Sequence, residues 1–159
     1  MDDDDHYYED VPWADPSIRK NYEAALGRLI LAHNEVDLRV TRLIERCLER
    51  LGSPAPMERL KRGLLAERLR ALDLLKALPL NLELAEIDVE KLHQLNTDRN
   101  VVAHGHFEKN PFDGDYILIG AKQHFSDYSI ERLESVAKEL RAEARYLSAL
   151  VDFYDPPLD

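Results

Sequence analysis

Residues 98–105 hold the side chains of this 159-residue chain that are best suited to chemistry. If this segment is helical, Asn100 and His104 lie four residues apart on one face and can contact one ligand. Arg99 lies about 140° around the helix from His104, but its long side chain can reach across a groove. A guanidinium binds phosphate through two hydrogen bonds and stabilises developing charge, and an imidazole moves protons. These residues therefore predict phosphate chemistry.

The order Arg99-Asn100, three apolar residues and then His104-Gly105 resembles the signature of the HEPN superfamily. In that family an arginine is usually followed by a polar residue, and a histidine follows after a short stretch. The four residues between Arg99 and His104 fall within this spacing. The resemblance extends over residues 16–151, and only the short motif is specific. It implies a helical bundle, commonly dimeric, and a metal-independent ribonuclease that acts as a toxin or an antiviral effector.

The same resemblance implies roles for the residues of the motif. Arg99 would bind the scissile phosphate, His104 would act as general acid or base, and Asn100 would orient His104 or the phosphate. The RNA 2′-hydroxyl would attack the adjacent phosphate and leave a cyclic phosphate end, in a cleft shared by two protomers. RNA, a second copy of the chain and an antitoxin protein are the implied partners, and no cofactor is implied. Because some family members are inactive, the alternative is a non-catalytic dimeric interaction or RNA-binding module.

Several HEPN groups carry an acidic residue opposite the motif, on the first long helix. With Val36 at zero on a helical wheel, the apolar stripe of that helix centres at about 45°. Asp37 falls at about 100°, on the flank of the stripe, and Glu35 at about −100°, on the solvent side. His33 falls at about 60°, within the stripe, and can pair with Asp37 four residues later. We therefore predict that Asp37 and His33 support the site, together with Gly105, which leaves space beside the histidine of the motif.

Each of these residues also has a structural interpretation. His33 can be a hydrogen-bonded core residue, and Asp37 can orient it or cap a buried arginine. Arg99 can pair with Asp98 or Asp37, and His104 can be a plain C-cap.

A third interpretation is a metal site. Nitrogen and oxygen ligands occur within fourteen positions at His93, Asp98, His104 and His106. No cysteine pair and no His-Glu-x-x-His pattern accompanies them, so we predict no metal.

Apolar spacing predicts the helices that must position these side chains. The first is expected over 16–51, with Asp15 as N-cap, Pro16 at its first position and Gly52 after its end. The second is expected from near Pro56 to Leu78. One side of it is expected to carry Leu60, Leu64, Leu72 and Leu75.

The third helix is expected to begin after Asp88 as N-cap and to be closed by Gly105 in the left-handed conformation. Residues 107–121 contain turn formers and a short β-like run, so they predict a small hairpin. Ser129 is the expected N-cap of the last helix, with Tyr128 and Leu133 forming a hydrophobic staple. The predicted fold class is therefore all-α: an up-and-down four-helix bundle with a hairpin-like insertion before the last helix.

The net charge of −10 is concentrated at the ends of the chain. Residues 1–15 hold seven acids and residues 152–159 hold three, without a lysine or arginine, so we expect two acidic tails around one domain at 16–151. That domain is neutral, with 21 acids and 21 bases, and residues 39–76 have a local excess of five bases. The charge therefore does not exclude RNA. The N-terminal tail could cover a basic cleft or only increase solubility.

The single cysteine, Cys47, excludes an intramolecular disulfide framework, and its place on the apolar stripe predicts a buried thiol. No uncharged apolar run approaches the roughly 20 residues of a membrane span. The N-terminus is acidic and lacks an apolar segment, unlike a signal peptide. We therefore expect a cytoplasmic protein with no membrane partner.

Overall fold

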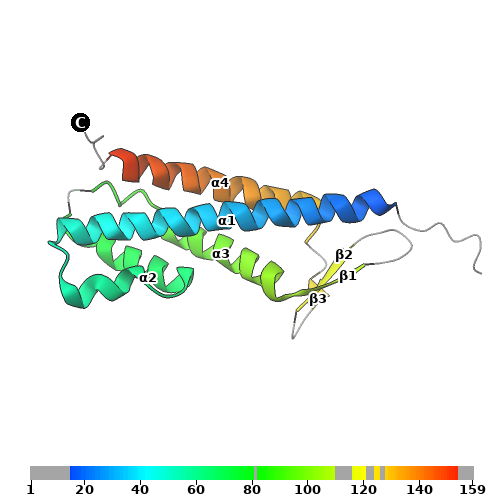
Figure 1. Ribbon diagram of the computed structural model, residues 1–159, viewed down its shortest axis with the longest axis horizontal. Helices are drawn as coiled ribbons and strands as arrows, with labels where there is room; N and C mark the ends of the chain where they lie inside the picture. Colours follow the sequence, from blue (N-terminus) through cyan, green and yellow to red (C-terminus); the bar gives the residue numbers. More distant parts are fainter. Residues whose placement is uncertain (1–14, 81, 110–115, 121–123, 126–127, 154–159) are drawn as a thin grey trace, which may run out of the picture.

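The computed structural model describes residues 15–80, 82–109, 116–120, 124–125 and 128–153, and these are mostly helical (Figure 1). In chain order the elements are α1 (Pro16–Arg50), η1 (Ala55–Lys61), α2 (Leu65–Lys76), α3 (Val89–His104), β1 (His106–Lys109), β2 (Tyr116–Ile119), β3 (His124–Phe125) and α4 (Ile130–Phe153). Most of the two expected acidic tails, 1–14 and 154–159, lies outside the described residues. Asp152 belongs to α4.

The first helix confirms its sequence prediction at both ends. Asp15 accepts a hydrogen bond from the backbone N–H of Ser17 at 2.8 Å, and Pro16 occupies the first position of α1. Such an N-cap typically contributes about 1 kcal/mol. Gly52, at a φ of 77°, follows the end of the helix. Cys47 is fully buried as expected, and burial raises the pKa of its thiol to about 11.

The expected second helix is instead two shorter segments, η1 and α2, separated at Gly63. Gly63 has a φ of 92°, in the left-handed region that ends helices. A new helix then starts, and the Glu67 carboxylate accepts a hydrogen bond from the Leu64 backbone N–H at 2.8 Å. Leu64 is 74% exposed, so it does not lie on the apolar side that the spacing predicts. A continuous helix over 56–78 is therefore wrong, because Gly63 reverses the chain.

This reversal changes the direction of the last helix. Helices α1 and α4 lie side by side and run the same way (Figure 1). Near the start of both helices, Tyr22 donates a hydrogen bond to the Tyr128 carbonyl at 2.6 Å. Six residues later in each sequence, Arg28 of α1 pairs with Glu134 of α4, so both helices advance in the same direction. A simple up-and-down bundle of four helices would place its first and last helices antiparallel. The expected up-and-down order is therefore wrong in this respect, and the extra reversal at Gly63 is the reason.

The third helix crosses back toward the start of α1 and positions the motif. Asp88 caps α3 by accepting from the Lys91 backbone N–H at 2.9 Å, as predicted. The side chain of Lys91 pairs with Glu143 of α4 at 2.8 Å, and farther along α3, Asp98 pairs with Arg132 at 3.1 Å. Because higher numbers in α3 meet lower numbers in α4, these two helices are antiparallel.

The predicted hairpin is present as a three-stranded antiparallel sheet in the order β1-β2-β3. The ring of Tyr22 in α1 stacks on Tyr116 with ring centroids 4.3 Å apart, and Phe107 packs edge-on against the same ring at 5.4 Å. Leu118 in β2 is fully buried. These apolar contacts hold the sheet against α1 beside the end of α3.

The last helix begins as predicted. The Ser129 hydroxyl accepts from the Arg132 backbone N–H at 3.2 Å, and the staple residues Tyr128 and Leu133 are both buried. The apolar faces of α1, α2, α3 and α4 share one core with Leu118. Among the described helices, none combines the length and the apolar character needed to cross a membrane.

Candidate functional site

A cleft of about 390 Å³ lies between α1, the first turns of α2 and the C-terminal half of α3. Five residues singled out in the sequence line it: His33 and Asp37 from α1, and Arg99, Asn100 and His104 from α3. Two distant segments of the chain therefore bring their predicted side chains to one place. The sixth predicted residue, Gly105, does not line the cleft.

Asp98 faces away from the cleft toward α4. Its carboxylate accepts from the Tyr128 hydroxyl at 3.1 Å and from the Arg132 guanidinium at 3.1 Å. It is therefore engaged by α4 and not by Arg99, contrary to one structural interpretation of the sequence. These contacts fix the rotation of α3, and they turn the next two residues of the motif, Arg99 and Asn100, into the cleft.

Arg99 is partly buried in the cleft wall. Its Nη1 donates to Asn100 Oδ1 at 3.1 Å, and its Nε has no hydrogen-bond partner among the described residues. A guanidinium carries five donors, so a second group can be bound there. Asn100 therefore orients Arg99, whereas the sequence suggested that it orients His104 or a phosphate directly.

His104 is the last residue of α3 and is exposed at the cleft. Gly105 follows with φ −82° and ψ 160°, so the predicted left-handed conformation is wrong: the chain passes straight into β1 in an extended form. The space beside Gly105 is not open either. A Cβ built there would overlap the Leu118 side chain, so a glycine is needed because β2 approaches the end of α3 closely.

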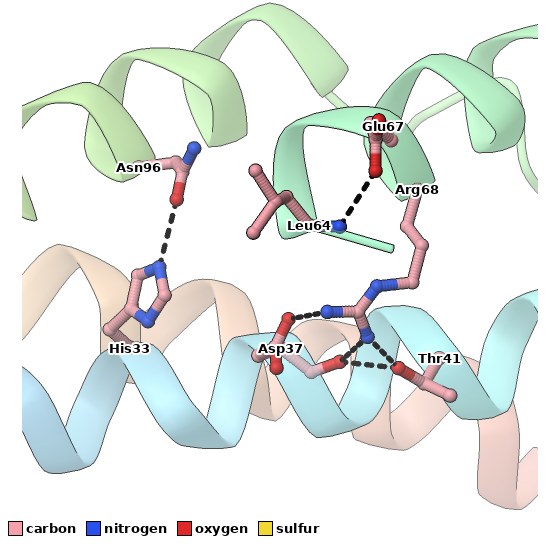
Figure 2. A network of polar contacts seen from close by, with 7 residues as sticks. All are labelled: His33, Asp37, Thr41, Leu64, Glu67, Arg68 and Asn96. Atoms are coloured by element: carbon pink, nitrogen blue, oxygen red, sulfur yellow. Dashed lines mark hydrogen bonds and ion pairs between the residues drawn. The ribbon is translucent and has the colours of Figure 1, made fainter. Parts of the chain in front are cut away.

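His33 is a hydrogen-bonded core histidine at the cleft, in agreement with its structural interpretation. It is 5% exposed, and its Nε2 donates to Asn96 Oδ1 at 3.0 Å (Figure 2). An amide oxygen only accepts, so Nε2 carries the proton; Nδ1 has no hydrogen-bond partner among the described residues. Burial lowers the pKa of His33, although the hydrogen bond to Asn96 opposes this shift. The expected direct pair with Asp37 is absent, because the Asp37 carboxylate is bound to Arg68 instead.

The lowered pKa of His33 predicts a pH-dependent stability. In the unfolded chain His33 takes up a proton below about pH 6.5, whereas the folded chain resists protonation. Acidification through this range should therefore lower the melting temperature of the wild type. In a chain of this size, 1 kcal/mol corresponds to about 2–4 °C. Thermal melts between pH 7.5 and 5.5 should show a weaker dependence in His33→Gln, and the wild-type dependence in the control His93→Gln. Equal slopes for wild type and His33→Gln would contradict this role.

Asp37 is bound to an arginine that the sequence did not single out, Arg68 of α2 (Figure 2). The Asp37 carboxylate pairs with Nη2 of Arg68, while Nη1 of Arg68 donates to Thr41 Oγ1 and, at 3.4 Å, to the Asp37 carbonyl. Thr41 Oγ1 in turn donates to the same carbonyl at 2.9 Å. Asp37 therefore caps a buried arginine, which was one of its structural interpretations. As the helical wheel predicted, Glu35 is exposed to solvent instead.

The four residues of the alternative metal site do not gather. His93 lines a separate hollow between α2 and α3, with Arg70 and Glu90 among its neighbours. Asp98 is engaged with Arg132 and Tyr128, as described above. No cluster of three or more potential metal ligands forms in the part of the chain that the structure describes.

The cleft combines two guanidinium groups, Arg68 and Arg99, with one carboxylate and an exposed imidazole. Two arginines can hold a phosphate-bearing ligand, and His104 can exchange a proton with it. Comparisons of the chain with protein-family models, with curated proteins and with solved structures gave no match. The chemistry of this cleft is therefore the basis on which a function can be inferred.

Proposed function

We propose that this protein is a metal-independent endoribonuclease with a HEPN-like helical bundle. One observation supports the proposal best: Arg99, Asn100 and His104 of the motif line one cleft with Asp37 and His33 of α1. The motif and Asp37 lie more than sixty residues apart in the sequence, and they line the same cleft.

In this proposal Arg99 binds the scissile phosphate and stabilises the charge that develops on it. Asn100 holds the guanidinium through the 3.1 Å hydrogen bond to Nη1. His104, exposed at the end of α3, takes the proton from the 2′-hydroxyl or gives one to the departing 5′-oxygen. The bond from the 2′-oxygen to phosphorus forms as the bond to the 5′-oxygen breaks, which leaves a 2′,3′-cyclic phosphate.

Such a reaction uses both a base and an acid, which favours a homodimer. Each cleft supplies one exposed imidazole, that of His104, because His33 is buried and engaged with Asn96. A second copy would supply the other imidazole. Leu64, exposed where it lines the cleft, gives the rim an apolar side chain for such a contact. The proposed setting is the cytoplasm, where the enzyme acts as a toxin or defence effector and is restrained by an antitoxin protein.

The proposal is tested by incubating the purified protein with total RNA in excess chelator and analysing the new 3′ ends. We expect shorter RNA fragments with 2′,3′-cyclic phosphates, because no step of the mechanism uses a metal. Chelation should not slow the reaction. RNA that stays intact, with or without added divalent cations, would contradict the proposal.

The second candidate is a non-catalytic RNA-binding module. The observation that favours it is the engagement of Asp37 with Arg68, which leaves this carboxylate without a direct part in proton transfer. Intact RNA together with salt-sensitive RNA binding would support this candidate. In that case the logarithm of the affinity should fall with the logarithm of salt concentration by about 0.7 for each phosphate contacted.

A further inference from the structure

Arg68 is a buried cation whose place in the cleft stability alone does not explain. The residue is 8% exposed, yet it lines the cleft together with Arg99. A buried ion pair contributes little net stability compared with apolar side chains of similar size, because both ions lose their hydration. A leucine or methionine would fill the same space in α2 without that penalty. The charge of Arg68 therefore suggests a ligand.

The hydrogen bonds of Arg68 divide its guanidinium into two edges. Nη1 donates to Thr41 Oγ1 and to a backbone group, the Asp37 carbonyl. Among the described residues Nη2 is paired only with the Asp37 carboxylate, and Nε, which is itself buried, has no hydrogen-bond partner. The edge formed by Nε and Nη2 has the geometry that binds two oxygens of a phosphate. The Asp37 carboxylate occupies only the Nη2 half of this edge, and its side chain can rotate.

Asp37 is placed to act as an exchangeable counter-ion. Its side chain is 37% exposed, against 10% for the side chain of Arg68, so the carboxylate lies on the cleft side of the pair. If the carboxylate rotates away, Thr41 and the Asp37 carbonyl still hold Arg68 in position. A phosphate could then take both the position of the carboxylate and the unused Nε.

We propose that Arg68 is a second phosphate-binding residue of the cleft and that Asp37 is the counter-ion it exchanges for RNA. The ligand is single-stranded RNA: Arg99 binds the scissile phosphate, and Arg68 binds a neighbouring phosphate of the same strand. This inference rests on the proposed function, which places RNA in the cleft. Asp37 is then a positioning residue that holds Arg68 ready while the cleft is empty and competes with RNA for it.

The test measures binding of a short 2′-O-methyl oligoribonucleotide by fluorescence anisotropy at several salt concentrations. This probe has no free 2′-hydroxyl, so it reports binding without cleavage. Asp37→Asn removes the competing charge and should bind at least threefold more tightly than the wild type. Arg68→Met should bind at least tenfold more weakly, with a salt slope smaller by about 0.7, the value of one single-strand phosphate contact. Arg70→Met, which removes an exposed arginine of the same helix, should bind as the wild type does.

A purely structural ion pair would give a different pattern. Both Asp37→Asn and Arg68→Met would then lower the melting temperature, and neither would change the affinity of the folded protein. That result would overturn the proposal. If Arg68→Met does not fold, Asp37→Asn decides alone: unchanged or weaker binding overturns the proposal, and tighter binding supports it.

The failure of this inference can be told apart from the failure of the proposed function. Cleavage of unmodified RNA together with unchanged affinities in both variants would overturn only the role of Arg68. Shifted affinities without cleavage by the wild type would support the role of Arg68 and contradict the nuclease.

Discussion

Replacement of His104 by alanine is expected to lower the rate of RNA cleavage at least 100-fold without changing the helical content. A general acid or base contributes about 10²–10⁴-fold to a rate. The side chain is exposed at the last turn of α3, so its removal leaves no cavity in the core. The rate is measured on a defined RNA in excess chelator, and the helical content by far-ultraviolet circular dichroism.

His106→Ala is the matched control for this substitution. His106 is also exposed and lies two residues farther along, at the start of β1, outside the cleft. Its replacement should leave the cleavage rate unchanged. His104→Ala should still bind the 2′-O-methyl oligonucleotide, because Arg68 and Arg99 remain. Equal cleavage rates for wild type and His104→Ala would refute the catalytic role. Induced expression in a bacterium makes the same comparison in cells: the wild type should be toxic, and His104→Ala should relieve the toxicity.

The starts of α1, α3 and α4 could be predicted from the sequence because their caps act within one turn. Asp15, Asp88 and Ser129 each accept a hydrogen bond from a backbone N–H two or three residues later. That geometry depends on local residues alone, so the spacing in the sequence contains it. The same holds for the faces of α1, where the helical wheel placed Asp37 inward and Glu35 outward.

The path of the chain between helices could not be read in the same way. An apolar stripe looks the same whichever way a helix runs, so no periodicity reports that α4 is parallel to α1. The direction depends on the reversal at Gly63, whose positive φ also separates η1 from α2. A glycine within a leucine-rich segment was the available signal, and the apolar spacing around it masked that signal.

The partners inside the cleft depend on contacts between distant segments. Asp37 meets Arg68, 31 residues later, and His33 meets Asn96, 63 residues later. The local pattern showed that Asp37 lies beside the core and can cap a buried arginine, but only packing of α2 against α1 selects which arginine. The excess of bases over residues 39–76, which includes Arg68, was a further sign in the sequence of a second cation near this site.

Replacement of Gly105 by alanine is expected to destabilise the protein, although its backbone conformation suits an alanine. The φ of −82° is open to any residue. An alanine would also restrict the unfolded chain, which by itself would stabilise the folded protein by about 0.4–1 kcal/mol. Against this gain, a Cβ would overlap the buried Leu118 side chain and lie 2.9 Å from the Val101 carbonyl oxygen. Overpacking of this kind costs about 1–3 kcal/mol, so the net change is a loss of stability.

Gly27→Ala is the control that makes this experiment decisive, because it adds the same methyl group with the opposite expected effect. Gly27 lies within α1, and no atom lies within 4 Å of a Cβ built there. Alanine is favoured over glycine inside a helix by about 1 kcal/mol, so thermal melts should show a higher melting temperature for Gly27→Ala and a lower one for Gly105→Ala. Because His104 precedes Gly105 directly, the second variant should also cleave RNA more slowly at temperatures where it is folded. A melting temperature at or above that of the wild type for Gly105→Ala would show that β2 can move away from α3, and that this contact does not fix the position of His104.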